Sequence, residues 1–228
     1  MNILIETIAR YEKGAFIDVG ANAGQTLLKV KSLFPHMQYI GFEPNIYCAG
    51  YVSEIIQANH FENCVIFPIG LGDKDSIATL FCHNHSDPKG TVIDNFRGKE
   101  ATLLQQTVLI RDAGTFINSL NVDKIALVKI DVEGYEASVL SGMKSILQQQ
   151  RPFIICEVLR THGPHHPSYD FRCTSRTSCE TVLNDSHYTI WAATKRLTVE
   201  PVVHLSDQFT NYTFVPQEKA YIVQQIAT

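Results

Sequence analysis

The stretch Phe16-Ile-Asp-Val-Gly-Ala-Asn-Ala-Gly24 decides the fold of this chain. Its first residues belong to an apolar run from Ala15 to Val19, which predicts a short buried strand. Gly20 and Gly24 then supply two positions without side chains, where a strand can turn tightly into a helix. Apolar residues at helical spacing follow as far as Pro35. We therefore expect the unit of strand, glycine turn and helix that begins a parallel α/β sheet.

The same alternation of short apolar runs and longer amphipathic segments continues along the chain. Further strands are predicted at residues 38–42, 64–69, 126–130, 153–158, 188–192 and 211–215. Further helices are predicted at residues 3–11, 46–58, 134–149 and 175–184. This order favours an open, doubly wound α/β fold with a mostly parallel sheet and helices on both faces. Ligands bind such sheets at the carboxyl ends of the strands, near the point where the strand order reverses.

The alternation breaks for almost sixty residues in the middle of the chain. Residues 77–81 and 107–110 look extended, and they flank the polar stretch 83–106, which has no core-facing period. Long irregular segments in compact domains tend to be functional or disordered. We interpret residues 83–106 as a lid or a variable excursion, and we expect it to cover a substrate together with residues 162–172.

Length, composition and charge set the class of protein. The 228 residues are 45% hydrophobic, which suits one domain over residues 1–228 with its motifs at about 14–160 and further strands and loops at 161–228. A net charge of -4 gives no bulk reason to expect a nucleic-acid partner. No apolar run approaches the roughly 20 residues of a membrane span, and the first residues do not resemble a signal peptide. We expect a soluble, cytoplasmic protein.

The cysteines and paired histidines show no metal-binding spacing. The six cysteines include no C-x-x-C motif, so we expect reduced thiols. His83 with His85, and His165 with His166, lie in polar stretches without a further ligand at suitable spacing, so we interpret them as loop residues.

Candidate binding residues follow the first predicted strands. Asp18 can accept a hydrogen bond from an ammonium group, and Asn22 adds a donor and an acceptor within the glycine turn. A turn that holds a pyrophosphate has little use for a neighbouring carboxylate, because like charges repel. Gly20 and Gly24 would leave backbone amides open to a ligand, although a turn with nothing bound is the alternative.

Two more carboxylates follow the second and third strands. Glu43 lies a little over twenty residues beyond Gly20, where a carboxylate can receive both hydroxyls of a ribose. Its alternative role is to cap the next helix. Asp73, in Gly70-Leu-Gly-Asp73, could meet the amino group of an adenine or could simply belong to a turn.

The candidate catalytic residues follow the fourth and fifth strands of the parallel set. Asp131 and Glu157 end neighbouring strands, so both should point into one crevice and could act as general base for a hydroxyl group. The pair could instead hold a magnesium ion, or Lys129 could provide the counter-charge and leave no need for a metal. His162 could be the base, or it could be a solvated loop residue.

Several of these motifs together resemble one family. They are Phe16-Ile-Asp-Val-Gly-Ala-Asn-Ala-Gly24, Gly41-Phe-Glu-Pro-Asn45, Val128-Lys-Ile-Asp-Val-Glu-Gly-Tyr-Glu136 and Arg151-Pro-Phe-Ile-Ile-Cys-Glu-Val158. In order and spacing the chain resembles the FkbM family of S-adenosylmethionine-dependent methyltransferases. The resemblance implies a Rossmann-like class I methyltransferase fold with a seven-stranded sheet whose last strand is antiparallel, and methyl transfer to a hydroxyl. It also implies that Asp18, Gly20 and Gly24 surround the methionine part of the cofactor and that Glu43 holds its ribose.

Two rival functions share some of these features. An NAD-dependent oxidoreductase would have the glycine turn and Glu43, but Gly20-Ala-Asn-Ala-Gly24 lacks two glycines of the G-x-G-x-x-G pattern. A non-catalytic binding protein of the same fold would be expected to lose the cofactor residues, which are all present here. The polar composition of residues 83–106 and 162–172 favours a sugar, a glycan or another hydroxyl-rich small molecule as acceptor.

Overall fold

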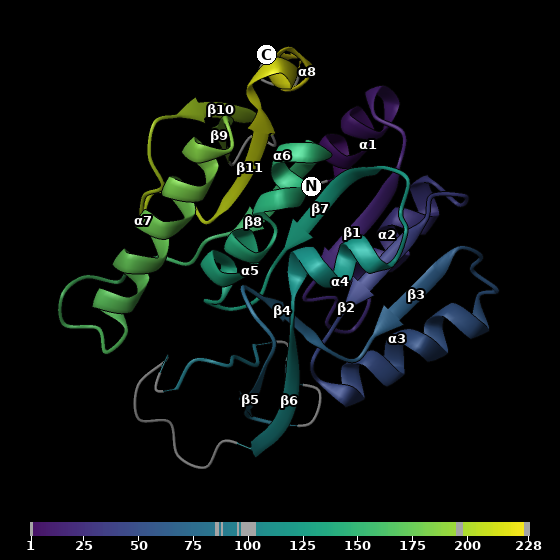
Figure 1. Ribbon diagram of the computed structural model, residues 1–228, viewed down its shortest axis with the longest axis horizontal. Coiled ribbons are helices and arrows are strands. Elements are labelled where there is room, and N and C mark those ends of the chain that lie inside the picture. Colours follow the sequence, from purple (N-terminus) through teal and green to yellow (C-terminus); the bar gives the residue numbers. More distant parts are fainter. Residues whose placement is uncertain are drawn as a thin grey trace.

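The computed structural model, described for residues 2–84, 87, 89–94, 96, 104–194 and 198–225, is built on a central sheet (Figure 1). Within these residues the sheet has eight strands in the order β10-β9-β11-β8-β7-β1-β2-β3. Their bounds are β1 Ala15–Val19, β2 Tyr39–Phe42, β3 Cys64–Phe67, β7 Ile125–Ile130, β8 Phe153–Glu157, β9 Tyr188–Ala193, β10 Val199–Val202 and β11 Asn211–Pro216. Strands β3, β2, β1, β7 and β8 are parallel, and β11 runs antiparallel between β8 and β9.

Helices cover both faces of this sheet because its strand residues alternate between two apolar cores. On β1, Ile17 and Val19 belong to the core beneath α4–α7, whereas Phe16 belongs to the core beneath the other helices. The first set is α4 Ala113–Ser119, α5 Glu136–Gly142, α6 Lys144–Gln149 and α7 Tyr169–Asp185. The second set is α1 Asn2–Tyr11, α2 Gln25–Leu33, α3 Ile46–Ala58 and α8 Ala220–Gln224, the last preceded by the 3-10 turn Gln217–Lys219. The predicted doubly wound arrangement is confirmed.

A second, three-stranded sheet occupies the region where the predicted alternation breaks. It consists of β4 Gly70–Gly72, β5 Ser76–Cys82 and β6 Leu104–Asp112, in the order β4-β6-β5. Strands β5 and β6 are antiparallel, and they form a ribbon at the lower edge of the molecule in Figure 1. Residues 85, 86, 88, 95 and 97–103 of the predicted lid lie outside the described residues, as does His85 of the first histidine pair.

The structure corrects the sequence-based prediction in three places. The main sheet has an eighth strand, β10, at its edge, and Pro201 within it hid the strand pattern because proline lacks an N–H donor. Helix α7 begins at Tyr169 rather than at 175, because Arg172 in its first turn is buried by polar contacts instead of an apolar stripe. The predicted helix 134–149 is divided into α5 and α6 at Met143. Among the described helices, none has the length and apolar character needed to cross a bilayer.

Candidate active site

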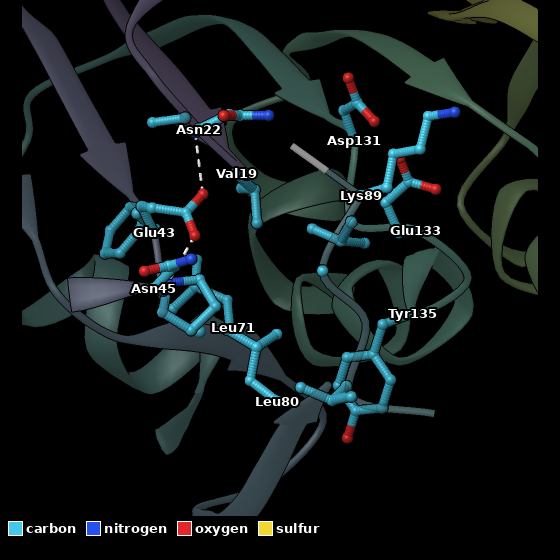
Figure 2. Close-up of a pocket in the computed structure, with 18 of the residues that line it drawn as sticks. Val19, Asn22, Glu43, Asn45, Leu71, Leu80, Lys89, Asp131, Glu133 and Tyr135 are labelled. Atoms are coloured by element: carbon cyan, nitrogen blue, oxygen red, sulfur yellow. Dashed lines mark hydrogen bonds between the residues drawn. The ribbon is translucent and has the colours of Figure 1, made fainter. Parts of the chain in front are cut away.

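A cavity of about 480 Å³ opens where the strand order reverses. Strand β1 has β2 on one side and β7 on the other, so the residues after these strands meet at one edge of the sheet. Figure 2 shows Asn22 and Glu43 on one side of the cavity, Asp131 on the other, and Leu71 and Leu80 below. The cavity therefore has a polar rim and an apolar wall, as small-molecule sites commonly do.

The glycine turn after β1 is closed by its own hydrogen bonds. The amides of Gly20 and Ala21 both donate to the carbonyl oxygen of Phe42, at 2.9 and 3.1 Å. The amide of Asn22 donates to the Glu43 carboxylate at 2.8 Å, and the next two amides donate to oxygens within the turn. Each backbone N–H from residue 20 to residue 24 thus has an internal acceptor. A turn of this kind offers no row of free donors to a pyrophosphate.

Gly20 is required by the neighbouring strand. Its φ of 82° lies in the left-handed region, and a Cβ there would lie 1.9 Å from the carbonyl oxygen of Asp131. Gly20 lines the cavity together with Asn22, whereas Gly24 is the N-cap of α2 and does not line it. The turn positions Asn22 at the cavity because β1 and β7 approach each other so closely at Gly20.

Glu43 is a buried carboxylate on the cavity wall. Its two oxygens accept the amides of Asn22, at 2.8 Å, and Asn45, at 2.9 Å. Burial raises the pKa of Glu43 to about 7, although the two amides lower it in part. The N-cap of α3 is Asn45 rather than Glu43, and Glu43 itself lines the cavity. Its remaining lone pairs can accept hydroxyl groups of a ligand.

Asp18 does not reach the cavity but anchors a buried ion network on the α2 side of the sheet. It is fully buried, and it accepts the Tyr39 hydroxyl at 2.5 Å. The Lys129 ammonium lies 3.4 Å from Asp18 and 3.3 Å from Asp131, and it also donates to the carbonyl oxygen of Gly20 at 3.2 Å. Burial opposes the charge on Lys129, but the two carboxylates outweigh it and raise its pKa. Lys129 is therefore a cation shared between Asp18 and Asp131.

Asp131 and Glu157 lie next to each other at the cavity, as predicted from their strands. Ile130 on β7 pairs with Cys156 on β8, so the following residues stand side by side. Burial raises the pKa of Glu157, and the negative charge of Asp131 raises it further. Among the described residues, no hydrogen-bond or ion-pair partner holds the Glu157 carboxylate.

Besides Asp18 and Gly24, two more predicted site residues lie away from the cavity. The exposed His162 has its ring 5.1 Å from the ring of His166 and is not part of the lining. Asp73 accepts the Ser138 hydroxyl at 2.9 Å, so it is held against α5. Leu71, two residues earlier, lines the cavity instead. The chain turns away from the cavity after β4, so Leu71 faces it and Asp73 does not. No pattern in the sequence indicated β4.

The apolar wall was not predicted from the sequence. Leu80 and Ile110 belong to β5 and β6, and Tyr135 precedes α5. The extended pattern of 77–81 and 107–110 was a usable signal, but it did not show that the two strands fold back over the site. The predicted magnesium site finds little support. No group of three or more His, Cys, Asp or Glu in the described ranges could hold a metal ion, and Asp131 already pairs with Lys129.

Comparisons with known proteins place the fold. Residues 18–176 match the family described as the methyltransferase FkbM domain. The structure resembles a methyltransferase FkbM from Methylobacillus flagellatus KT, with a TM-score of 0.53 and 14% identity over 89% of this chain and 43% of that one. The present chain thus spans less than half of that protein. A search of curated proteins found no match.

Two further solved structures share the fold. A proposed caffeoyl-CoA O-methyltransferase from Staphylococcus aureus has a TM-score of 0.53 and 13% identity, over 93% of this chain and 80% of that one. A proposed methyltransferase from Streptococcus mutans, in complex with SAH, has a TM-score of 0.51 and 10% identity, over 93% of this chain and 96% of that one. At these identities the likeness shows the fold alone, which is that of the class I methyltransferases with one strand added at the edge of the sheet.

Proposed function

The chain belongs to the FkbM methyltransferase family, and we propose that it binds S-adenosylmethionine in the cavity and methylates a hydroxyl group of a sugar or another small metabolite. The observation that carries this proposal is the buried Glu43 carboxylate, held by two amides and facing the cavity. A carboxylate in that position can accept both hydroxyls of a ribose. The apolar wall of Leu71, Leu80 and Ile110 suits a flat base such as adenine.

The closed glycine turn favours this cofactor over a dinucleotide. A pyrophosphate needs unpaired amides or a nearby cation, but the amides from residue 20 to residue 24 are all used within the protein. Asn22 at the rim carries no charge, which suits a neutral or zwitterionic group better than a pyrophosphate. This observation supports the proposed function over that of an NAD-dependent oxidoreductase.

Asp131 and Glu157 would act on the acceptor. S-adenosylmethionine supplies an electrophilic methyl group on a sulfonium. The chain has to bind the acceptor hydroxyl, orient it and remove its proton. Asp131 is paired with Lys129, which favours an acceptor-binding role. Glu157 has a raised pKa and is the better general base, whereas the exposed His162 would need the 162–172 segment to move before it could serve.

Calorimetric titration with S-adenosylmethionine, S-adenosylhomocysteine and NAD tests the cofactor. We expect both sulfur compounds to bind, and Glu43→Ala to weaken each by about 10- to 100-fold because charge-assisted hydrogen bonds are lost. The matched control is Glu54→Ala, an exposed glutamate on α3. Binding of NAD but of neither sulfur compound would overturn the proposal.

A methyl-transfer assay over a panel of sugars tests the acceptor. We expect a labelled methyl group in a product that resists mild base, since an ether is stable there and a methyl ester is not. Tight cofactor binding with no transfer to any hydroxyl acceptor would favour the non-catalytic alternative. Transfer to an amine or a carboxylate would contradict hydroxyl methylation.

A further inference from the structure

Two neighbouring carboxylates at the β7–β8 edge of the cavity lack a full set of counter-charges. Asp131 directly follows β7 and Glu157 ends β8, and the Ile130–Cys156 pairing sets them side by side. Adjacent parallel strands are about 4.8 Å apart, so the two acids stand close enough to repel each other. Both line the cavity, and Figure 2 shows Asp131 on the side opposite Glu43.

The Lys129 ammonium, which pairs with Asp131, is already shared with a second carboxylate. Lys129 lies 3.3 Å from Asp131 but also 3.4 Å from the fully buried Asp18, so one ammonium serves two carboxylates. Glu157 has no hydrogen-bond or ion-pair partner among the described residues. Lys89 also lines the cavity, but its side chain is exposed at the rim, where water and salt screen it. The acid pair therefore keeps a net negative charge that faces the ligand space.

In the proposed reaction, the cofactor loses its positive charge beside Asp131 and Glu157. Methyl transfer forms a bond between the acceptor oxygen and the methyl carbon and breaks the carbon–sulfur bond, whose electron pair stays on sulfur. The hydroxyl proton passes to a base. A sulfonium with a positive charge enters, and a neutral thioether leaves. If Glu43 binds the ribose at one side, the sulfur end of the cofactor is directed across the cavity towards the acid pair.

We propose that Asp131 and Glu157 discriminate between the cationic cofactor and its neutral product, so that the loss of charge on methyl transfer itself weakens binding and promotes product release. The inference rests on the proposed function. It assigns the acid pair a role in binding in addition to any role in proton removal. Burial and the negative charges of Asp131 and Glu133 raise the pKa of Glu157 more than Lys129 lowers it, which agrees with a site that is short of positive charge.

Equilibrium titration with three ligands tests this role without any acceptor. The ligands are S-adenosylmethionine, S-adenosylhomocysteine and sinefungin, which carries an ammonium in place of the sulfonium. Each is titrated into the wild type, Glu157→Gln, Asp131→Asn and the control Glu54→Gln, with a chelator present. Thermal melts of each variant verify that it is folded.

We expect the wild type to prefer the two cationic ligands to the thioether. Glu157→Gln should weaken both cations by about 10-fold and the thioether by less than about 2-fold, because only the cations lose a Coulomb attraction. Asp131→Asn should act in the same direction, and Glu54→Gln should change none of the three affinities. High salt should reduce the preference, since it screens partly exposed charges.

The outcomes separate this inference from the proposed function. Equal weakening of cationic and neutral ligands by Glu157→Gln would overturn the inference and leave the proposed function standing. A preference that depends on added magnesium would assign the acid pair to a metal and would also overturn it. Binding of neither sulfur compound to the wild type would overturn the proposed function and the inference together.

Discussion

Glu43 is the residue whose titration should control the affinity for the cofactor. Burial raises its pKa to about 7, and only the ionised form can accept both ribose hydroxyls without donating a proton itself. The affinity for S-adenosylhomocysteine should therefore rise between about pH 6 and about pH 8. Titrations across this range verify the trend. In Glu43→Gln the affinity should be lower and nearly independent of pH, and the same pH dependence in the wild type and this variant would assign the titration to another group.

Gly20 should be intolerant of even a single methyl group. In Gly20→Ala the new Cβ would meet the Asp131 carbonyl oxygen at 1.9 Å, in a left-handed backbone conformation. We expect a loss of about 3 kcal/mol or more in the free energy of unfolding, measured with urea. The matched control is Gly50→Ala in α3, where nothing lies within 4 Å of the new Cβ and the helix should gain about 0.5–1 kcal/mol. Equal stabilities of the two variants would contradict the close approach.

At the scale of residues, the sequence predicts positions at strand ends better than it predicts side-chain surroundings. Glu43, Asp131 and Glu157 reach the cavity because each directly follows or ends a strand of the main sheet. Asp18 also lies in a strand, but its neighbours Tyr39 and Lys129 turn it into a buried anchor. Such cross-strand partners depend on the register between strands, and no single segment of sequence records that register.

The side chain of Phe96, which follows β5, packs against elements from other parts of the chain. The ring of Phe96 fills the space beside Gly134, where a Cβ would lie 2.5 Å from Phe96 Cζ. The Arg172 guanidinium lies 4.2 Å from the ring centroid, and it also donates to the Arg160 carbonyl oxygen at 2.6 Å. Phe96 thus ties the segment after β5 to the turn after β7 and to α7.

Removing this ring should destabilise the protein and loosen β5 and β6. Phe96→Ala should lower the free energy of unfolding by about 3 kcal/mol, because a fully packed aromatic ring is lost. It should also increase hydrogen exchange in β5 and β6. Ile77→Ala is the control, since Ile77 lies on β5 and is 73% exposed. A variant that exchanges like the wild type throughout β5 and β6 would show that Phe96 does not hold the ribbon.

At the scale of elements, strongly periodic segments were predicted and non-local or polar ones were not. The strands of the parallel set have continuous apolar runs, which a sequence shows directly. The pairing of β5 with β6 joins segments separated by a long polar stretch, and β10 contains Pro201. The first turns of α7 are stabilised by contacts of Arg172, which carry no apolar period.

For the whole molecule, buried carboxyl groups should make the ligand-free protein less stable as the pH rises. Burial raises the pKa of Glu43 and of Glu136 from 4.5 to about 7. A carboxyl group that binds its proton more tightly when folded contributes stability below its unfolded pKa, and this is lost as the pH rises through the folded value. Glu218 behaves in the opposite way, because the hydrogen bond from Arg151 lowers its pKa to about 2, so its contribution is lost as the pH falls.

The free energy of unfolding should therefore be highest near pH 4.5–5 and should fall towards about pH 8. Urea unfolding at a series of pH values measures this profile. Glu136→Gln should flatten the decline between about pH 5 and about pH 8, whereas Glu54→Gln should leave it unchanged. A wild-type stability that is level across that range would contradict the raised pKa values.

The glycine turn has a consequence for how the whole molecule meets its ligand. Because each amide from residue 20 to residue 24 already has its acceptor, the turn keeps its shape in the empty protein. No conformational entropy has to be given up there when a ligand arrives, so this side of the cavity is preorganised. Any ordering that accompanies binding therefore has to come from other parts of the cavity wall, such as Leu80 on β5 and Ile110 on β6. Because this side of the cavity already has its shape, substitutions elsewhere in the wall can alter the ligand that is accepted without disturbing the turn.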